Sequence, residues 1–555
     1  MRATAGSAPV PEVSRSSRIF GNPAAMTGID WALLAIVLVG AAAVRAIFYT
    51  GFFGSDEVTY VDAAMSAANG SWPNSTYIGA IRLGVNLPIA AAISIFGTSE
   101  PAVASWGFVC SVVEVAAVYW FGNRTMGRPL AVVASLVLAL LPLHVHLAGR
   151  IMADPPLALF ITATFVLLFE AQQRQSNLLY LLAGVCAGLT FWIKEAALIF
   201  VAVPVLWAMV RRDAFRGWPW FFGGLATLVA GNFASMWVLS GNPMHLLSSV
   251  GASLGRYDAL AAQGNADYSS AALYYPDYLF LRVWHTWLLG YFAVLGIVTA
   301  ALRIRRNTPD AATLRYLLVW AVGLVGIFSL MIVSVSPLRF IPKQTNYMTI
   351  FLAPLSVLAG IGLLALRPIA RSLGLSIYVL GALVLCALEQ QTIYTFTANS
   401  RTALVFAGEH PEATVYVVTN AERLNRWVAM VSHTDVAPVR NLRSMSFLFD
   451  ASKDGPKPSR AISSAGDDLA IVDVETIGWG NNGIGSVMQI PPCWEKMGSL
   501  PAKANATAAG VVTRSIETVL RFLPAGAGAS AADKLAERFT TLPALLYRVP
   551  AACAN

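Results

Sequence analysis

The sequence predicts a polytopic α-helical membrane protein with an α/β domain at its C-terminal end. Three observations support this class: the composition, the spacing of long apolar runs and the uneven distribution of arginine. Of the 555 residues, 56% are hydrophobic and only 12% are charged, and the mean hydropathy is +0.61. Soluble domains carry about 25% charged residues, so this chain has too little polar surface for a water-soluble globule. The few acidic residues and histidines also argue against a disordered chain, a soluble nucleic-acid-binding protein and a dense metalloprotein.

Eleven apolar runs are candidates for spanning helices. Such a helix needs about 20 apolar residues to cross about 30 Å of hydrocarbon. The fourth to sixth runs are short, so one of them could tilt, break or be miscounted. Residues 1–28 are polar and are predicted to be a disordered cytoplasmic segment. They do not form a signal peptide, because the run after them is long and has no small-residue cleavage site. The runs lie near residues 30–50, 101–121, 129–147, 155–171, 178–193, 196–210, 217–239, 283–302, 314–335, 348–366 and 373–390.

The arginines orient these runs. They concentrate in the short loops on one side of the predicted membrane, and cytoplasmic loops are enriched in basic residues. The N-terminus is therefore predicted to be cytoplasmic and the C-terminal region to be extracytoplasmic. Only two of the seven lysines precede residue 450. On the outer side, the short loops carry few basic residues, namely Arg150, Lys194, Arg339 and Lys343.

Three outer segments are too long to be simple turns: 51–100, 240–282 and 391–555. The first contains two amphipathic stretches, around 57–69 and 79–96, that could lie along the membrane surface. We expect a transmembrane domain over residues 29–390, with 51–100 and 240–282 as its outer loops.

The last segment, 391–555, is expected to form an extracytoplasmic α/β domain. TVYVV (414–418) and DLAIVDV (468–474) are predicted to be buried strands, and a helix, ERLNRWVAMV, lies between them. PAGAGASAA (524–532) is predicted to be a flexible loop. Cys493 and Cys553 could pair if this domain faces an oxidising compartment.

Nearly all ionisable residues near the outer membrane face fall into four short clusters. These are GSDEVTY (54–60), AGRIMADPPL (148–157), WIKEA (192–196) and SPLRFIPKQTNY (336–347). Charges at the edge of the hydrocarbon are expensive to hold, so they are candidates for a functional site. The two acidic and two basic clusters suggest phosphate-linked group transfer, because basic side chains bind phosphate and a carboxylate can take a proton from a hydroxyl. If helical, Lys343 and Tyr347 would share a face.

Each cluster also has a purely structural interpretation. Asp56 and Glu57 could begin a helix, where carboxylates favour the helix dipole, and Asp154 could cap the next helix. Lys194 and Glu195 could be interfacial residues with their charged ends in water, and the charges near 339–343 could be ordinary loop residues. The occurrence of all four clusters on one face favours the functional interpretation.

Three polar residues inside the runs are predicted to be structural. Glu114 lies in the middle of a span and needs a partner, for which Arg45 is a candidate. His144 and His146 are two residues apart and would point in different directions on a helix. They therefore form a poor metal pair, and we expect packing or a hydrogen bond instead.

The clusters resemble motifs of the GT-C glycosyltransferases, the superfamily of the protein O-mannosyltransferases and the lipid A aminoarabinose transferase. The resemblance covers about residues 30–366 and is closest to bacterial members that use a polyprenyl-phosphate sugar. Each motif is weak alone, but four in order at matching topological positions are fairly specific. They are SDEVTYVDAAMSAANGSWP, RIMADPPLALF, GLTFWIKEAALIFVAVPVL and RFIPKQTNYMTIFLAPLSVLAGIGL.

The resemblance implies a GT-C-like fold, an inverting transfer of a sugar to an acceptor hydroxyl, and an active site on the periplasmic face of the bacterial inner membrane. It implies Asp56 as general base with Glu57 beside it, and Asp154 as a residue that orients acceptor or sugar. The donor would be an undecaprenyl- or decaprenyl-phosphate sugar, and the acceptor a lipid, a polysaccharide or a protein. The residues expected to bind the substrates are Tyr60, Arg82, Lys194, Glu195, Arg339, Lys343 and Tyr347.

The chain departs from the aminoarabinose transferases at IRLGVNLP, where those proteins carry Glu-Lys-Pro. Here Arg82 and Asn86 are present without a carboxylate. No cofactor is implied with certainty, and a divalent cation could take part, but a metal site built on that glutamate is in doubt.

Two other functions are kept as alternatives. A lipid or glycolipid transporter would carry charges along a central pathway, discontinuous helices and internal repeats, whereas here the charges gather on one face. A glycan ligase that uses a diphosphate carrier would share the fold, but more arginines would be expected on the outer face.

Overall fold

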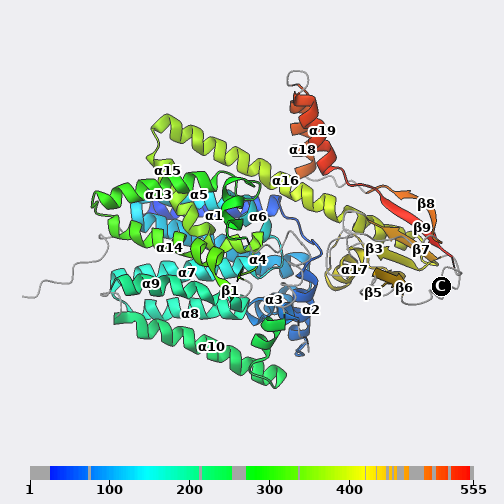
Figure 1. Cartoon of the computed structure of the whole chain (residues 1–555), viewed down its shortest axis with the longest axis horizontal. Coiled ribbons are helices and arrows are strands. Elements are labelled where there is room, and N and C mark those ends of the chain that lie inside the picture. Colours follow the sequence, from blue (N-terminus) through cyan, green and yellow to red (C-terminus); the bar gives the residue numbers. More distant parts are fainter. Residues whose placement is uncertain are drawn as a thin grey trace, which may run out of the picture.

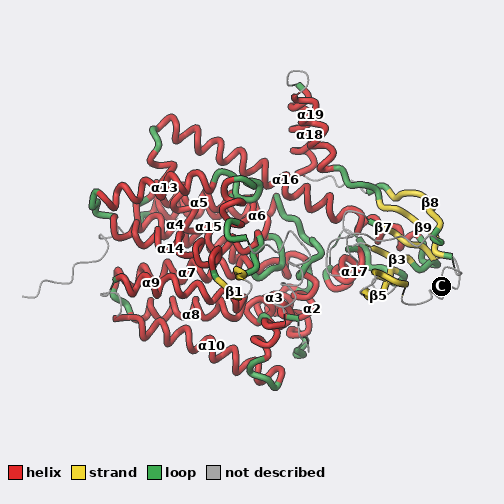
Figure 2. The backbone as a smooth tube through the Cα atoms, viewed as in Figure 1, coloured by secondary structure: helices red, strands yellow, loops and turns green. Residues whose placement is uncertain are grey.

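The structure is a computed structural model that describes most of the chain between Met26 and Pro550. A bundle of long helices forms one part, and a smaller sheet domain lies at one end of it (Figures 1 and 2). The long helix α16 leads from the bundle to that domain. The residues outside the description are 1–25, 73–74, 76, 212–215, 253–270, 336–337, 419, 433, 435, 445–448, 453–454, 459–467, 474–492, 503–507, 523–526 and 551–555.

The bundle consists of apolar helices joined mostly by short connections. Its helices are α1 (Gly28–Ile47), α4 (Glu100–Met126), α5 (Arg128–Leu140), α6 (Pro142–Ala148), α7 (Asp154–Arg174), α8 (Asn177–Lys194), α9 (Ala202–Val210), α10 (Trp218–Ser240), α13 (Leu289–Arg305), α14 (Ala311–Leu330), α15 (Thr349–Ala365) and α16 (Pro368–Glu409).

Among the described residues, eight helices are long and apolar enough to cross a membrane, or nine if the bent pair α5–α6 is one span. The protein is a multi-pass membrane protein, but the expected number of eleven spans is higher than this count. Two features account for the difference. The run at 283–302 becomes α13, whose 17 residues fall short of the roughly 20 needed. The runs at 178–193 and 196–210 follow one another without a loop and form one stretch, Asn177–Met209, that is a single candidate span by length and composition.

The chain reverses its direction within this stretch, at Lys194. Lys194 has φ −157° and ψ 87°, outside the helical region, and a 3-10 helix (Glu195–Val201) follows it. Lys194 Nζ donates to Asp154 at the start of α7 (2.9 Å), whereas Trp207 near the end of α9 donates to Gln172 near the end of α7 (3.1 Å). Since α7 is about 30 Å long, the chain returns along α7. The turn therefore places Lys194 at the end of the bundle where α7 begins.

Glycines let helices of the bundle approach closely, as is common between membrane helices. A Cβ atom at Gly184 of α8 would collide with the carbonyl oxygen of Phe221 on α10. A Cβ atom at Gly224 of α10 would collide with the carbonyl oxygen of Leu181 on α8. The α8–α10 contact is therefore a backbone contact that larger residues would separate.

Both amphipathic stretches expected in the first outer segment are helical. They form α2 (Glu57–Ala68) and α3 (Leu83–Phe96), with a 3-10 turn at Ile78–Ile81 between them. These helices lie at the end of the bundle that faces the sheet domain (Figure 1). Three further elements precede bundle helices in the chain: α12 (Tyr274–Phe280) and the antiparallel strands β1 (Ile332–Val335) and β2 (Leu338–Phe340).

The C-terminal domain contains a mixed five-stranded sheet with the strand order β4-β3-β7-β9-β8. The two predicted strands are confirmed as β3 and β7, which pair in parallel, and the predicted helix is α17. Every residue of β7 is buried, as expected for an apolar run in a parallel pair. The elements are β3 (Val415–Val418), α17 (Ala421–Met430), β4 (Leu442–Ser444), β5 (Phe449–Ser452), β6 (Gly455–Pro458), β7 (Asp468–Val472), β8 (Glu495–Leu500), α18 (Ala508–Arg521), α19 (Ala527–Phe539) and β9 (Ala544–Val549).

The structure bears on three expectations for the C-terminal region. Residues 527–532 belong to helix α19, so the predicted loop at 524–532 is wrong there. Its alanines favour a helix, and Phe539 of α19 packs on Leu388 of α16. Cys493 is disulfide-bonded, whereas Cys553 lies outside the described residues. Helix α16 also continues without a break across the expected domain boundary at 390.

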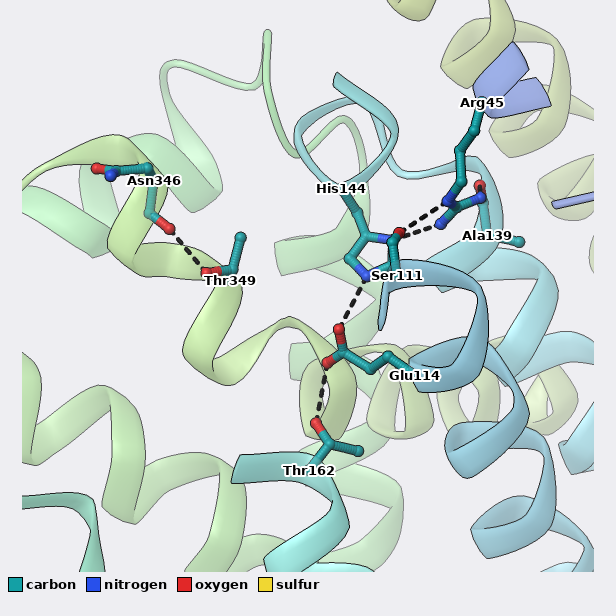
Figure 3. A network of polar contacts seen from close by, with 8 residues as sticks. All are labelled: Arg45, Ser111, Glu114, Ala139, His144, Thr162, Asn346 and Thr349. Carbon is teal, nitrogen blue, oxygen red and sulfur yellow. Dashed lines mark hydrogen bonds and ion pairs between the residues drawn. The ribbon is translucent and has the colours of Figure 1, made fainter. Parts of the chain in front are cut away.

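A buried polar network connects four of the bundle helices (Figure 3). Arg45 of α1 donates to His144 Nδ1 of α6 (2.6 Å) and to Ser111 Oγ of α4 (2.7 Å). Glu114 of α4 accepts hydrogen bonds from His144 Nε2 (3.0 Å) and from Thr162 of α7 (2.9 Å). Arg45 therefore reaches Glu114 through His144 and not directly. The hydrogen bond expected for His144 is confirmed.

Candidate active site

The acidic pair after α1 marks the start of helix α2. Asp56 is half-buried and accepts a hydrogen bond from the Tyr77 hydroxyl. Glu57 is buried, accepts a hydrogen bond from the backbone N–H of Ser55 (2.7 Å), and lies 3.5 Å from Arg150 Nε. Burial raises the pKa of Glu57, and the Arg150 guanidinium opposes this rise. The two neighbouring carboxylates therefore have different surroundings, and Asp56 is the more accessible one.

Arg82, at the N-terminus of α3, connects two other residues expected at the site. Its NH1 group donates to the Tyr60 hydroxyl (3.0 Å), and its Nε lies 3.6 Å from Glu195 Oε2. Burial raises the pKa of Tyr60; Arg82 opposes this rise, and the carboxylates of Asp56 and Asp154 add to it. Tyr60 therefore lies in the electrostatic field of both acidic clusters.

Asp154 and Lys194 form a buried ion pair at the same end of the bundle. Lys194 Nζ donates to Asp154 Oδ1 (2.9 Å), and Asn346 Nδ2 donates to Asp154 Oδ2 (3.0 Å). The Lys194 ammonium also lies 3.8 Å from the centre of the Tyr347 ring. Three of the four sequence clusters thus meet at Asp154. The sequence analysis did not single out Asn346.

The fourth cluster is less regular than expected. Lys343 precedes the 3-10 helix at Thr345–Met348 and is not on a helix with Tyr347, so the expected shared face is wrong. Pro342 before it and the short β-hairpin before that replace a regular helix. Lys343 is fully buried, donates to the Ile341 carbonyl (3.2 Å), and lies 5.3 Å from the Phe340 ring. Burial lowers the pKa of Lys343 to about 8.

Arg339 lies on β2, opposite Ser334 of β1. Its side chain lies outside the described part of the structure. Its expected role therefore stays a prediction.

The structure brings most of the expected residues together and adds three partners. Lys194 contacts both Asp154 and Tyr347, and Arg82 contacts both Tyr60 and Glu195. Tyr77, Arg150 and Asn346 were not expected at the site. The sequence offers one indication that Arg150 belongs to the site, because it is one of the few basic residues on the outer side. It offers no such indication for Tyr77, whose contact with Asp56 joins residues 21 positions apart.

The described residues contain no group of three or more histidine, cysteine, aspartate or glutamate side chains arranged to hold a metal ion. Asn86, at the position where a carboxylate is missing, is buried and donates to the carbonyls of Gly79 (3.1 Å) and Ala80 (2.9 Å). Its amide therefore holds the 3-10 turn before α3, which is a structural task. The donor set described does not fit a metal site of the kind considered for this position.

Comparison with protein families gives one match. Residues 83–237 match the family described as dolichyl-phosphate-mannose-protein mannosyltransferase. The matched segment runs from α3 to α10 and includes Asp154, Lys194 and Glu195. No protein with a curated description matches the chain.

The solved structures similar to this chain include an oligosaccharyltransferase and ArnT. The oligosaccharyltransferase of Archaeoglobus fulgidus, tethered with an acceptor peptide, has a TM-score of 0.50 and 12% identity, covering 81% of this chain and 69% of that one. ArnT from Cupriavidus metallidurans in the apo state has a TM-score of 0.48 and 14% identity, covering 81% and 93%. The same protein bound to undecaprenyl phosphate has a TM-score of 0.47 and 15% identity, covering 81% and 94%.

The oligosaccharyltransferase likeness concerns the fold, and the family match concerns residues 83–237. Both agree with the resemblance that the four sequence clusters carry, and the clusters meet at one end of the helical bundle. Residues 83–237 of this chain match the dolichyl-phosphate-mannose-protein mannosyltransferase family, and the fold of the chain is similar to that of the Archaeoglobus fulgidus oligosaccharyltransferase.

Proposed function

We propose that this protein transfers a sugar from a polyprenyl-phosphate donor to an acceptor hydroxyl on the extracytoplasmic face of a bacterial inner membrane. The observation that carries the proposal is the meeting of acidic and basic side chains from four distant segments at one end of the bundle. The matched family is named for a dolichyl-phosphate-linked sugar, which supports a lipid-phosphate donor. The acceptor class, whether lipid, polysaccharide or protein, stays open.

Asp56 is the proposed general base. It is half-buried, so an acceptor hydroxyl can reach it, and the hydrogen bond from Tyr77 fixes one of its two oxygens. The acceptor oxygen attacks the anomeric carbon as Asp56 takes its proton. The bond from that carbon to the phosphate oxygen breaks, and the configuration is inverted by this direct displacement. Glu57 stays paired with Arg150 and keeps the start of α2 in place.

Lys194, Arg82 and Lys343 are the proposed binding groups for the leaving phosphate, together with Arg339. Charge-assisted hydrogen bonds from such groups are about twice as strong as neutral ones. They would stabilise the negative charge that develops on the phosphate as the bond breaks. Asp154 accepts hydrogen bonds from both Lys194 and Asn346, which orients Lys194 and leaves Asp154 at the edge of the sugar site.

The test uses the purified chain in lipid nanodiscs with a panel of undecaprenyl-phosphate sugars and candidate acceptors. Product and released undecaprenyl phosphate are quantified by mass spectrometry for wild type and Asp56→Asn. A general base contributes roughly 10²–10⁴-fold, so turnover by the variant should fall by that factor while donor binding is kept. Asp62→Asn is the matched control, because Asp62 lies on helix α2, which follows Asp56, and its side chain is more than half exposed.

Equal turnover by Asp56→Asn and wild type would refute the role of Asp56. If wild type binds none of the donors, the donor class is wrong, and the transporter becomes the better hypothesis. If wild type binds a donor without turnover, the acceptor panel is extended before the variants are compared.

A further inference from the structure

The segment that carries Asp56 has no regular structure of its own. Between the end of α1 at Ile47 and the start of α2 at Glu57, the chain forms turns and bends. Gly51 and Gly54 have positive φ values of 65° and 97°, a region that favours glycine. Because no helix or strand hydrogen bonds fix this segment, its neighbours must set the position of Asp56.

Helix α17 of the C-terminal domain supplies polar contacts to this segment. Arg423 NH1 donates to the Gly54 carbonyl (2.6 Å), and Asn420 Nδ2 donates to the Phe53 carbonyl (3.3 Å). A Cβ atom at Gly54 would collide with the Asn420 amide. The two carbonyls lie two and three residues before Asp56, so a shift of these donors would move the carboxylate.

Apolar contacts reinforce the same interface. The buried Phe52 ring lies 5.9 Å from the Trp427 ring of α17, and the Phe53 ring stacks on Phe396 of α16 at 5.2 Å. On its other side, Phe53 contacts the Arg150 guanidinium, 4.0 Å from the ring centre. The same guanidinium pairs with Glu57, the neighbour of Asp56. One continuous set of contacts therefore leads from α17 to the acidic pair.

A second connection holds α17 against the bundle at its other end. The backbone N–H of Ser432, two residues after α17, donates to the Thr98 carbonyl at the end of α3 (3.0 Å). Ser432 and Ser99 form an isolated parallel bridge. Helix α17 is thus held at both ends by the outer segment 51–100, so its position relative to Asp56 is fixed.

From these contacts we infer that α17 is a positioning element of the active site, in which Asn420 and Arg423 hold the Phe53–Gly54 backbone and thereby place the Asp56 carboxylate. This inference rests on the proposed role of Asp56 as general base. It assigns to the C-terminal domain a task in the chemical step, in addition to any recognition of the acceptor. Neither residue touches the reacting atoms.

The test compares Arg423→Gln with the matched control Arg426→Gln in full-length protein in nanodiscs. Arg426 lies on the same helix, is more than half exposed, and contacts the Asp62 side chain at 3.7 Å instead of the segment backbone. Misplacement of a catalytic group by about 1 Å can cost roughly 100-fold. We expect kcat to fall 10- to 100-fold in Arg423→Gln with donor KM changed less than threefold, and partial rescue in Arg423→Lys.

Hydrogen–deuterium exchange of residues 51–57 gives a readout that does not need turnover. We expect faster exchange in Arg423→Gln than in wild type and unchanged exchange in Arg426→Gln, with similar thermal unfolding midpoints. If wild type shows no transfer activity, the exchange measurement still tests whether α17 orders residues 51–57. Failure of the proposed function can therefore be distinguished from failure of this inference. Unchanged exchange, an unchanged kcat in Arg423→Gln, or an equal loss in Arg426→Gln would overturn the inference.

Discussion

Two charged sets of the membrane part, the network around Arg45 and the residues of the candidate site, differ in the lengths of their polar contacts. In the network around Arg45, hydrogen bonds of 2.6–3.0 Å connect Arg45, Ser111, His144, Glu114 and Thr162. In the outer set, Lys194–Asp154 and Arg82–Tyr60 are hydrogen bonds of 2.9 and 3.0 Å. The Arg150–Glu57 and Arg82–Glu195 pairs are 3.5 and 3.6 Å apart, too long for hydrogen bonds.

The difference separates a structural network from a candidate site. Arginine always donates, so His144 Nδ1 accepts from Arg45 and Nε2 carries the proton that it donates to Glu114. That chain is closed inside the bundle and joins four helices. The outer set lies at the end of the bundle, on helix ends and irregular segments, and two of its ion pairs are longer than hydrogen bonds. A charged residue in a membrane helix can therefore belong to a functional site or to a structural network, and its hydrogen-bond partners distinguish the two.

The largest effect is expected from a variant that breaks the network around Arg45. Arg45→Leu leaves Glu114 as a buried charge without its counter-charge, and such a loss costs about 3–5 kcal/mol. The thermal unfolding midpoint in detergent should fall strongly, with a lower yield of monodisperse protein. The double variant Arg45→Leu with Glu114→Leu should recover much of the loss, because no buried charge is left alone. A single variant as stable as wild type would contradict the structural interpretation.

Next in size is the loss of the proposed phosphate contact at Lys194. A hydrogen bond to a charged group contributes about 1.5–3 kcal/mol, so Lys194→Gln should weaken binding of undecaprenyl phosphate roughly 10- to 100-fold. Binding is measured by thermophoresis in detergent, with Lys534→Gln on the exposed face of α19 as control. The double variant with Asp154→Asn should keep the defect. If it restores binding, Lys194 acts only by neutralising Asp154.

The low pKa of Lys343 predicts a pH dependence of undecaprenyl phosphate binding. Burial lowers that pKa to about 8, so the side chain is charged below pH 8 and neutral above it. If the charged form binds phosphate, the Kd for undecaprenyl phosphate should rise about tenfold per pH unit above 8. Lys343→Arg should remove this dependence, because arginine stays charged. A wild-type Kd that is constant from pH 7 to 9.5 would exclude Lys343 from the phosphate site.

The smallest expected effect concerns the Tyr347 ring. Its centre lies 3.8 Å from the Lys194 ammonium, and such a cation–π contact contributes about 0.5–1 kcal/mol at an accessible site. Tyr347→Leu should weaken binding of undecaprenyl phosphate about two- to fivefold, whereas Tyr347→Phe keeps the ring and should bind like wild type. A defect of equal size in both variants would instead assign the effect to the hydroxyl.

The sequence predicted the membrane class, the outer helices α2 and α3, and the strands β3 and β7, because periodicity and composition are local properties. It also singled out four charged clusters that the structure brings together at one end of the bundle, since charges at a membrane edge are rare. It predicted eleven spans, whereas eight or nine helices among the described residues are long and apolar enough, because α13 is short and the runs before and after Lys194 join without a loop. It predicted a loop at 524–532, where contacts of α19 with α16 stabilise a helix.

By itself, the sequence determined that this chain spans a membrane and that its charged residues gather in a few acidic and basic clusters between the apolar runs. Hydrophobic burial and the cost of charge in hydrocarbon act on each segment separately, so their effects can be predicted from the linear sequence. Only the tertiary structure decided that His144 lies between Arg45 and Glu114, that Arg150 pairs with Glu57, and that α17 contacts the Asp56 segment. Hydrogen bonds act over about 3 Å and join residues up to several hundred positions apart, which only the folded chain brings together.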